Sequence, residues 1–271
     1  MKQGFVLPYG DARTAATAAV AAEEAGWDGF FVWEPVWGID AWVALTAAAM
    51  VTETIRLGTM LTPLSRMRPW KIASETATLD NLSGGRVILA VGLGAIDSGF
   101  ENFGEETDLK TRAELLDESL DIITGLWDGH PFAYEGTHYS MNTEGLLTPP
   151  PPGPVQQPIP IWVVGAWNRP RSMARALKYE GIIPNVIEDE AHVPVTPEHV
   201  ADMTSYIGGV RSEPIEVIAE GPTDPHDADD RRRHNEWELA GATWWLETMW
   251  DALDDADRVT ARITAGPTVP A

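Results

Sequence analysis

Short apolar runs rich in β-branched residues recur along the chain, and amphipathic or alanine-rich stretches separate them. The runs have the length of strands, and the stretches between them have apolar residues three or four positions apart, as helices do. Strands that alternate with helices are typical of an α/β protein with a parallel sheet. The eight expected strands are Gln3–Leu7, Gly29–Trp33, Arg56–Leu61, Arg86–Val91, Ile159–Val164, Ile182–Val186, Ile215–Ala219 and Thr243–Leu246.

Boundary residues mark the helices between these runs. Asp40 is a good N-cap residue, Pro69 suits a first helical turn, and Gly26 suits a helix end. Thr107 or Asp108 can cap a long helix that has one apolar stripe. The expected helices are Ala12–Ala25, Ala41–Met50, Pro69–Asn81, a helix from Thr107 or Asp108 to Trp127, Arg171–Glu180, Pro197–Gly208, Asp227–Ala240 and Asp251–Thr264.

Eight alternating units fit a closed (β/α)₈ TIM barrel, which usually takes about 250 residues. This chain has 271 residues. A doubly wound open sheet would use six of the runs nearly as well, so the pattern favours the barrel and leaves the open sheet as an alternative. We expect a single TIM-barrel domain over residues 1–271.

One segment interrupts the alternation between the fourth and fifth strands. Phe132–Tyr134 and His138–Ser140 flank a glycine-containing turn and indicate a β-hairpin. The proline-rich segment Thr148–Pro158 cannot form a helix or a central strand, so we expect a surface connection. A domain linker is the alternative, and the βα pattern on both sides argues against it. The barrel therefore carries a small hairpin and loop insertion.

Charge and composition exclude several classes of function. The chain has 19 basic and 41 acidic residues, a net charge of −22, so its field repels nucleic acid. No apolar run approaches the roughly 20 residues that span a membrane, and the first residues lack the core of a signal peptide. We expect a cytoplasmic protein. The absence of cysteine excludes disulfides, and the six histidines show no metal-ligand spacing, so no metal site is expected.

The carboxyl ends of the strands are where a barrel places its site. Glu34 follows the second expected strand directly. Burial there would raise the pKa of its carboxyl and suit it to proton transfer. The alternative is a structural carboxylate held by backbone amides or an arginine, and the residues alone favour that alternative.

Two glycine-containing turns also follow strands. Gly92-Leu93-Gly94 is either a tight turn or a place where the backbone approaches a flat ligand. A nicotinamide fingerprint would need a third glycine where Asp97 stands, which argues against a nicotinamide dehydrogenase on an open sheet. Gly165–Arg169 leads into a helix, whose first amides could bind phosphate, although every helix has such amides.

Tryptophan is abundant, with 12 residues. Seven of them lie near expected strand ends or the loops beyond. They either pack in the core or line a wide aromatic pocket. The seven are Trp33, Trp37, Trp42, Trp70, Trp167, Trp244 and Trp245.

Several of these stretches closely resemble the luciferase-like oxidoreductases. The order LGT, TP, RPW, ETATLDNLSGGR and VGLG within Ile55–Gly94 is specific to them. EEAGWDGFFVWE at Glu23–Glu34 and RAELLDESLDIITGLWDG at Arg112–Gly129 also match, as do IPIWVVGAW at Ile159–Trp167 and GATWWLE at Gly241–Glu247. The resemblance covers nearly the whole chain.

The resemblance implies a (β/α)₈ barrel, a homodimer, and either flavin mononucleotide (FMN) or the deazaflavin coenzyme F420 as coenzyme. It places Thr59, Met60 and Leu61 under the coenzyme ring, in a bulge that often contains a cis peptide bond. It places Gly92 and Gly94 along the coenzyme tail. It places the coenzyme phosphate at the turn that contains Gly165, Ala166, Trp167, Asn168 and Arg169.

The sequence departs from the family pattern at one position. Several deazaflavin-using relatives have an acid followed by histidine after the second strand, whereas this chain has Glu34-Pro35. We expect an oxidoreductase or monooxygenase in which Glu34 is the catalytic candidate, acting on a small apolar organic substrate with a supplier of reduced coenzyme. The missing histidine leaves a second hypothesis, a non-catalytic coenzyme-binding protein on the same barrel.

Overall fold

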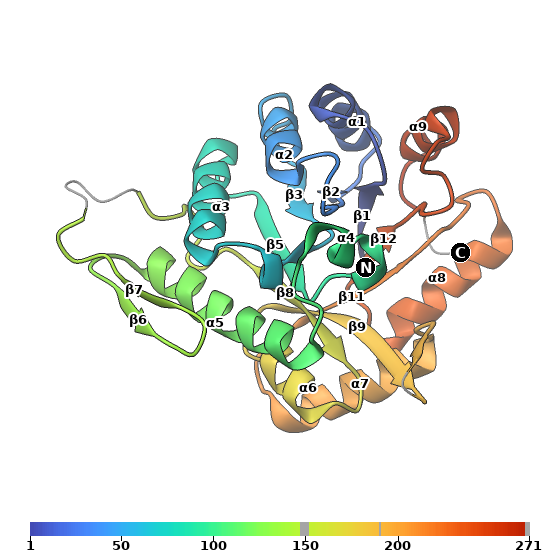
Figure 1. The fold of residues 1–271 in the computed structure, drawn as a ribbon. Helices are drawn as coiled ribbons and strands as arrows, with labels where there is room; N and C mark the ends of the chain where they lie inside the picture. The colour runs from blue at the N-terminus through green and yellow to red at the C-terminus, as the bar shows by residue number, and fades with distance from the viewer. Residues whose placement is uncertain (147–151, 190, 269–271) are drawn as a thin grey trace.

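Eight parallel strands close into a barrel in the computed structural model, which describes residues 1–146, 152–189 and 191–268 (Figure 1). Around the barrel the strands follow the order β1, β2, β3, β5, β8, β9, β11, β12, and β12 pairs with β1 again. The closed barrel confirms the expected fold, and the open sheet was the wrong alternative. The strands are β1 (Lys2–Leu7), β2 (Gly29–Val32), β3 (Arg56–Thr59), β5 (Val87–Gly92), β8 (Ile161–Ala166), β9 (Gly181–Glu188), β11 (Glu216–Gly221) and β12 (Trp244–Glu247).

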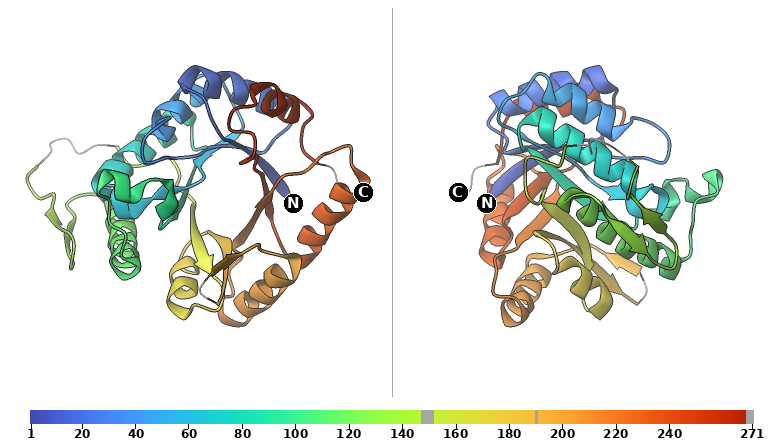
Figure 2. Two further views of the ribbon diagram at one scale, coloured as in Figure 1. Left: turned by 45° about the vertical axis from the view of Figure 1, so that its right-hand side comes forward. Right: turned by 90° about the vertical axis from the view of Figure 1, so that its left-hand side faces the viewer.

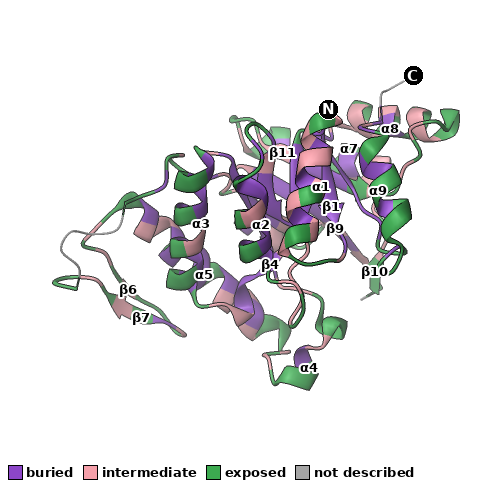
Figure 3. Cartoon of the chain, turned by 90° about the horizontal axis from the view of Figure 1, so that it is seen from above, coloured by how far each residue is buried: buried purple, intermediate pink, exposed green. Residues whose placement is uncertain are grey.

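Helices surround the strands on the outside (Figure 2). Their buried faces meet the barrel and their outer faces are exposed, as the banding in Figure 3 shows. They are α1 (Ala12–Glu24), α2 (Ala41–Ala49), α3 (Pro69–Ser83), α5 (Leu109–Asp128), α6 (Pro170–Ala176), α7 (Pro197–Val210), α8 (Ala228–Ala240) and α9 (Ala256–Thr264), with the short α4 (Phe100–Phe103), η1 (Leu64–Arg66) and η2 (Ile96–Ser98). No described helix has the length and apolar character needed to cross a bilayer.

Capping residues set several helix starts. Asp40 accepts the amide of Val43 at 2.8 Å, as expected. Asp108, rather than Thr107, caps α5 and accepts the amide of Thr111 at 2.8 Å. The last helix begins later than expected, at Ala256, because Asp255 caps it. A side-chain oxygen that binds a free amide fixes a helix start more sharply than the apolar pattern does.

Most strands run further toward their carboxyl ends than the apolar pattern indicates. β8 reaches Ala166 and β11 reaches Gly221, each two residues beyond the predicted end, because backbone pairing continues there through small or polar residues. β2 and β3 instead stop short of their predicted ends, at Val32 and Thr59. After a cis peptide bond between Met60 and Leu61, the chain continues as the two-residue strand β4 (Thr62–Pro63), which pairs with β5.

Three aromatic rings fill the inside of the barrel. Phe31 stacks on Trp162 with ring centroids 5.4 Å apart, and Trp244 meets Trp162 at 5.0 Å. Glycines on the neighbouring strands make room for them. A Cβ atom at Gly58 would lie 2.8 Å from the Phe31 ring, and one at Gly181 would lie closer still to Trp162. Large aromatic side chains therefore pack against glycines of neighbouring strands inside the barrel.

The expected hairpin forms between α5 and β8, with its strands β6 (Ala133–Glu135) and β7 (Ser140–Asn142) one to two residues further along the chain than predicted. It projects from the barrel (Figure 1). Buried Glu118 of α5 fixes its turn by accepting the amides of Thr137 and Tyr139 at 2.7 and 2.9 Å. Residues 148–151 of the proline-rich segment lie outside the described residues.

A short strand that the sequence analysis missed, β10 (Ala191–Val193), pairs antiparallel with β9. The single-domain assignment of residues 1–271 stays a prediction.

Candidate functional site

The carboxyl ends of the eight strands form the mouth of the barrel, where a TIM barrel carries its site. Side chains along each strand alternate between the inner wall and the outer helices. Met60, Ala90 and Leu246 belong to the inner wall. The same alternation places Gly92 and Glu220, each two residues beyond an inner residue of its strand, at the mouth.

The residues that the resemblance assigns to the coenzyme come together on one side of this mouth. Thr59–Leu61 end β3, Gly92 and Gly94 end β5, and the segment Gly165–Arg169 ends β8. β3 pairs with β5, and β5 pairs with β8, so these segments lie on consecutive strands. Segments more than 70 residues apart in sequence thus share one side of the mouth.

The turn after β5 is held from below by an arginine that the sequence analysis missed. Buried Arg112 donates to the carbonyl oxygens of Leu93 and Gly94, both at 2.6 Å, and its guanidinium lies over the Phe100 ring. Gly94 has φ +78°, and a Cβ there would lie 2.8 Å from Phe100 and Pro63. Both the positive φ and the lack of space therefore support the interpretation of Gly94 as a tight-turn residue.

Gly92 has a different reason to be glycine. A Cβ there would lie 2.9 Å from Val164 and 3.2 Å from Leu61. Its absence lets these two apolar side chains approach across the end of β5. Met60, Leu61 and Val164 together make an apolar wall beside this strand.

The turn after β8 combines internal bonds with free donors. The Trp167 amide donates to Asn185 at 2.7 Å, and the Arg169 amide donates to Ala166 at 3.1 Å. Asn168 has φ 61° and is exposed. Among the described residues, the amides of Arg171 and Ser172 donate to no protein acceptor at the start of α6. This donor set, with the exposed Arg169 side chain beside it, fits a phosphate group.

Gly165 also has a packing role in the barrel wall. A Cβ there would lie 2.4 Å from Ile182 and 3.5 Å from Ala176. The missing side chain therefore faces the barrel wall and α6, and a large residue would disturb the fold as well as any ligand. Trp167 packs edge-on against Tyr206 of α7 at 5.7 Å.

Glu34 is half-buried at the end of β2. The Thr62 hydroxyl donates to Glu34 Oε2 at 2.6 Å, and the Thr62 and Thr59 hydroxyl oxygens are 2.9 Å apart. Arg66 holds the backbone by donating to the Glu34 carbonyl at 2.9 Å. Burial raises the pKa of Glu34 to about 7, against the weaker lowering effects of Thr62 and Arg66. Thr59 points away from the inner wall, so Glu34 reaches the end of β3 from its outer side.

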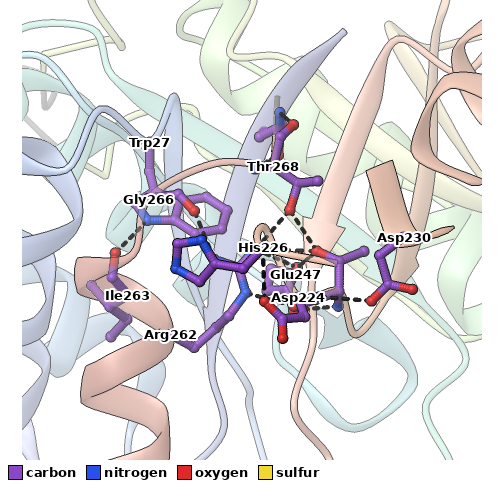
Figure 4. Close-up of polar contacts among 11 residues, drawn as sticks. Trp27, Asp224, His226, Asp230, Glu247, Arg262, Ile263, Gly266 and Thr268 are labelled. Atoms are coloured by element: carbon purple, nitrogen blue, oxygen red, sulfur yellow. Dashed lines mark hydrogen bonds and ion pairs between the residues drawn. The ribbon is translucent and has the colours of Figure 1, made fainter. Parts of the chain in front are cut away.

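Glu247, the acid that ends β12, is bound into a structural network (Figure 4). Its carboxylate accepts the Thr223 amide at 2.7 Å and a guanidinium N–H of Arg262 at 3.0 Å. Arg262 also lies over the Trp27 ring at 4.9 Å and donates to Gly266 at 2.7 Å. Both ionic groups are buried, so this pair joins α9 to the barrel and gives Glu247 a structural role.

Glu220 is a third acid at a strand end, and the sequence analysis missed it because β11 was expected to stop at Ala219. It lies on the inner side of its strand, since its neighbour in register, Leu246, belongs to the inner wall. The apolar pattern ends at Ala219, so only the alternation of inner and outer residues could have indicated Glu220 from the sequence.

The seven tryptophans lie in different environments. Trp244 fills the barrel, and Trp42 and Trp245 are buried outside it. Trp70 packs edge-on against Tyr139 near the hairpin, and Trp37 is exposed. Trp33, just beyond β2, meets Trp250, just beyond β12, at the mouth.

A separate hollow of about 510 Å³ lies at the opposite end of the barrel, lined by the amino ends of the strands. Its Lys2 is paired with Glu216 at 3.0 Å. Because parallel barrels carry their chemistry at the carboxyl ends, the mouth is the candidate site. Among the described residues, no group of three or more histidines and acids is close enough to hold a metal ion.

Known proteins resemble this chain over most of its length. The family model described as luciferase-like monooxygenase matches residues 2–262. A Mycobacterium tuberculosis protein named for a coenzyme F420-dependent oxidoreductase is 33% identical over 68% of this chain and 55% of its own length. An F420-dependent glucose-6-phosphate dehydrogenase of Amycolatopsis mediterranei is 33% identical over 54% of this chain and 45% of its own. The chain spans about half the length of the curated relatives it matches.

Solved structures share the fold at low sequence identity. An F420-dependent secondary alcohol dehydrogenase with an F420-acetone adduct aligns with a TM-score of 0.74 and 17% identity over 96% of both chains. The FMN-bound oxygenating component of 3,6-diketocamphane monooxygenase from Pseudomonas putida aligns with a TM-score of 0.61 and 21% identity over 83% of this chain and 68% of its own. The family match over almost the whole sequence shows that this chain belongs to the luciferase-like monooxygenase family.

Proposed function

We propose that this protein is an oxidoreductase that binds the deazaflavin coenzyme F420 at the barrel mouth and uses it for hydride transfer with a small organic substrate. The observation that carries the proposal is the convergence of the β3, β5 and β8 ends on one side of the mouth. Relatives at 33% identity are named for F420-dependent reactions. FMN with oxygen activation is the second candidate, because a solved neighbour is FMN-bound.

The residues present suit either coenzyme. When bound, the coenzyme supplies the redox chemistry. Met60 and Leu61 offer an apolar wall for a ring. Asn168, Arg169 and the free amide of Ser172 offer local donors for phosphate. Such local donors matter because a net charge of −22 repels an anion at longer range.

Glu34 is the proposed proton-handling group. A pKa of about 7 keeps both its protonated and its ionised forms populated near neutral pH, as general acid–base catalysis needs. The hydroxyls of Thr62 and Thr59 link it to the end of β3. Pro35 stands where several deazaflavin-using relatives have histidine, so this carboxyl has no imidazole beside it in sequence.

Titration with F420 and with FMN, followed by absorbance and fluorescence, tests the proposal. We expect F420 to bind more tightly and to turn over with a substrate panel. Arg169→Ala should weaken coenzyme binding roughly ten- to a hundredfold, since a charge-assisted bond contributes about 1.5–3 kcal/mol. Arg13→Ala, an exposed arginine at the start of α1, is the matched control. Unchanged affinity in Arg169→Ala would place the phosphate elsewhere.

Two other outcomes are informative. Binding of F420 without turnover across the panel would favour a non-catalytic coenzyme-binding protein. Tighter binding of FMN, with oxygen consumption, would favour a monooxygenase. A homodimer in the cytoplasm, with a separate supplier of reduced coenzyme, stays a prediction, and sedimentation velocity tests the dimer.

A further inference from the structure

The barrel mouth has two halves, and only one of them is assigned to the coenzyme. The proposed coenzyme residues follow β3, β5 and β8. The ends of β9, β11, β12, β1 and β2 form the remaining half, and these five strands are consecutive around the barrel. The substrate must meet the coenzyme from this second half, so its side chains decide which substrates fit.

Glu220 of β11 is the carboxylate that faces this half from the inner wall. In register, Ile218 lies beside Trp244 and Glu220 lies beside Leu246. Ile218, Trp244 and Leu246 all belong to the inner cluster. Neighbouring residues in register on parallel strands point to the same face. The Glu220 side chain therefore points into the mouth.

Glu220 also has no charged partner among the described residues. Its side chain is exposed, yet desolvation raises the pKa of its carboxyl. The nearby Trp250 side chain opposes this rise in the pKa of the Glu220 carboxyl. Glu247, one residue after Leu246, the register neighbour of Glu220, is by contrast paired with Arg262. A partly desolvated carboxylate without a cation costs stability unless a ligand offsets its desolvation.

Two tryptophans complete the surroundings of Glu220. The Trp33 and Trp250 rings meet edge to face, with centroids 6.2 Å apart and an angle of 73°. Trp33 follows β2 and Trp250 follows β12, so the pair spans the same half of the mouth. Indole faces attract organic cations, and a carboxylate beside them adds a charge-assisted hydrogen bond.

The loops around this half have the same sign of charge. The loop at 248–255 has three aspartates and the loop at 222–227 has two, and neither has a lysine or arginine. Together with the net charge of −22, they make a field that attracts cations and repels anions. A phosphorylated substrate, such as the one named for the Amycolatopsis relative, is poorly suited to this field.

We infer that Glu220, Trp33 and Trp250 form a substrate subsite for a protonated amine on a small apolar or aromatic molecule. The inference rests on the proposed function for the placement of the coenzyme in the other half. Glu220 would bind the ammonium group directly, and the two indoles would cover the apolar part of the molecule.

Three probes with one ring and different charges test the subsite: phenethylamine, 2-phenylethanol and 3-phenylpropionate. Each is titrated into the protein at pH 8 by calorimetry and tryptophan fluorescence. We expect the amine to bind at least about tenfold more tightly than the alcohol and the carboxylate to bind least. Glu220→Gln should remove this tenfold preference. Glu216→Gln, on the inner side of the same strand at its opposite end, should retain it.

Two results would contradict the inference. Equal binding of all three probes, or an amine preference that persists in Glu220→Gln, would overturn the inference. Trp250→Leu provides a second variant, and it should weaken the amine and the alcohol together because it removes apolar contact. Circular dichroism checks that each variant is folded.

Parallel titrations with F420 and FMN separate this inference from the proposed function. Loss of the amine preference in Glu220→Gln with coenzyme binding unchanged supports both. If the wild-type protein binds neither coenzyme, the proposed function fails, and the probe titrations of the unloaded protein still decide the role of Glu220. If coenzyme binds and no amine preference is found, the subsite alone is wrong.

Discussion

Replacing Glu34 with glutamine should make the protein more stable above neutral pH and leave its stability nearly unchanged in mild acid. Burial raises the pKa of Glu34 from 4.5 to about 7. A carboxyl whose pKa is raised in the folded state favours folding in its protonated form. The penalty for its charge is therefore absent below pH 4.5, grows between pH 4.5 and 7, and is complete above pH 7.

The shift sets the size of the effect. Each pKa unit corresponds to about 1.4 kcal/mol, so the full penalty is about 3 kcal/mol, and less where water reaches the half-buried carboxyl. Glutamine has no charge to bury, and its side-chain oxygen can still accept the Thr62 hydroxyl. The free energy of unfolding of Glu34→Gln, minus that of the wild type, should rise by up to about 3 kcal/mol from pH 4.5 to pH 8.

Urea denaturation of both proteins at pH 4.5 and pH 8 measures this difference. Glu24→Gln, which changes an exposed glutamate on α1, is the control and should show no such rise. If Glu34→Gln shows the same difference at both pH values, burial does not disfavour the charge of Glu34. In a turnover assay the same variant should lose the inflection of kcat/KM near pH 7, and an unchanged profile would assign proton transfer to another group.

Three further changes test other parts of the structure. Arg262→Met should cost about 3–5 kcal/mol in urea denaturation because it leaves buried Glu247 unpaired, and a variant as stable as the wild type would contradict the network in Figure 4. Burial lowers the pKa of His234 to about 4, so the wild type should lose up to about 3 kcal/mol as the pH falls from 6.5 to 4. His234→Phe should lack this loss, and a parallel decline in both proteins would refute it. Gly181→Ala should destabilise strongly, since its Cβ would overlap the buried Trp162 ring, and thermal unfolding close to that of the wild type would show that the ring can move.

The arrangement of acids at the strand ends shows where sequence reasoning stopped. Glu34, Glu220 and Glu247 each stand at or just beyond the end of an apolar run, and nothing local distinguishes them. Glu247 pairs with Arg262 of α9, the helix that follows β12 and packs back against the barrel. Glu220 has no cationic partner among the residues that the structure describes. Whether a carboxylate is structural or free depends on partners that the fold brings from other segments.

Glycine gives a second example. From the sequence alone, nothing separates the roles of Gly58, Gly92, Gly94, Gly165 and Gly181. In the structure, Gly58 and Gly181 make room for aromatic rings inside the barrel, Gly165 for Ile182 in the wall, and Gly92 for Leu61 and Val164 beside the mouth. Only Gly94 among them has the positive φ that a tight turn requires. The sequence shows that a glycine has no Cβ, but it does not show which neighbouring atoms fill the space that a Cβ would take.

The sequence by itself determined the number of strands, their order and the class of fold, because apolar periodicity and capping residues are local properties that the chain carries in every conformation. The family motifs also located the segments that meet on one side of the mouth. The tertiary structure decided what each polar group at the mouth faces. Pairing extended β11 past Ala219 and turned Glu220 inward, while α9 returned along the barrel to neutralise Glu247. Burial and charge pairing depend on neighbours distant in sequence, so only the closed barrel could separate a free carboxylate from a structural one.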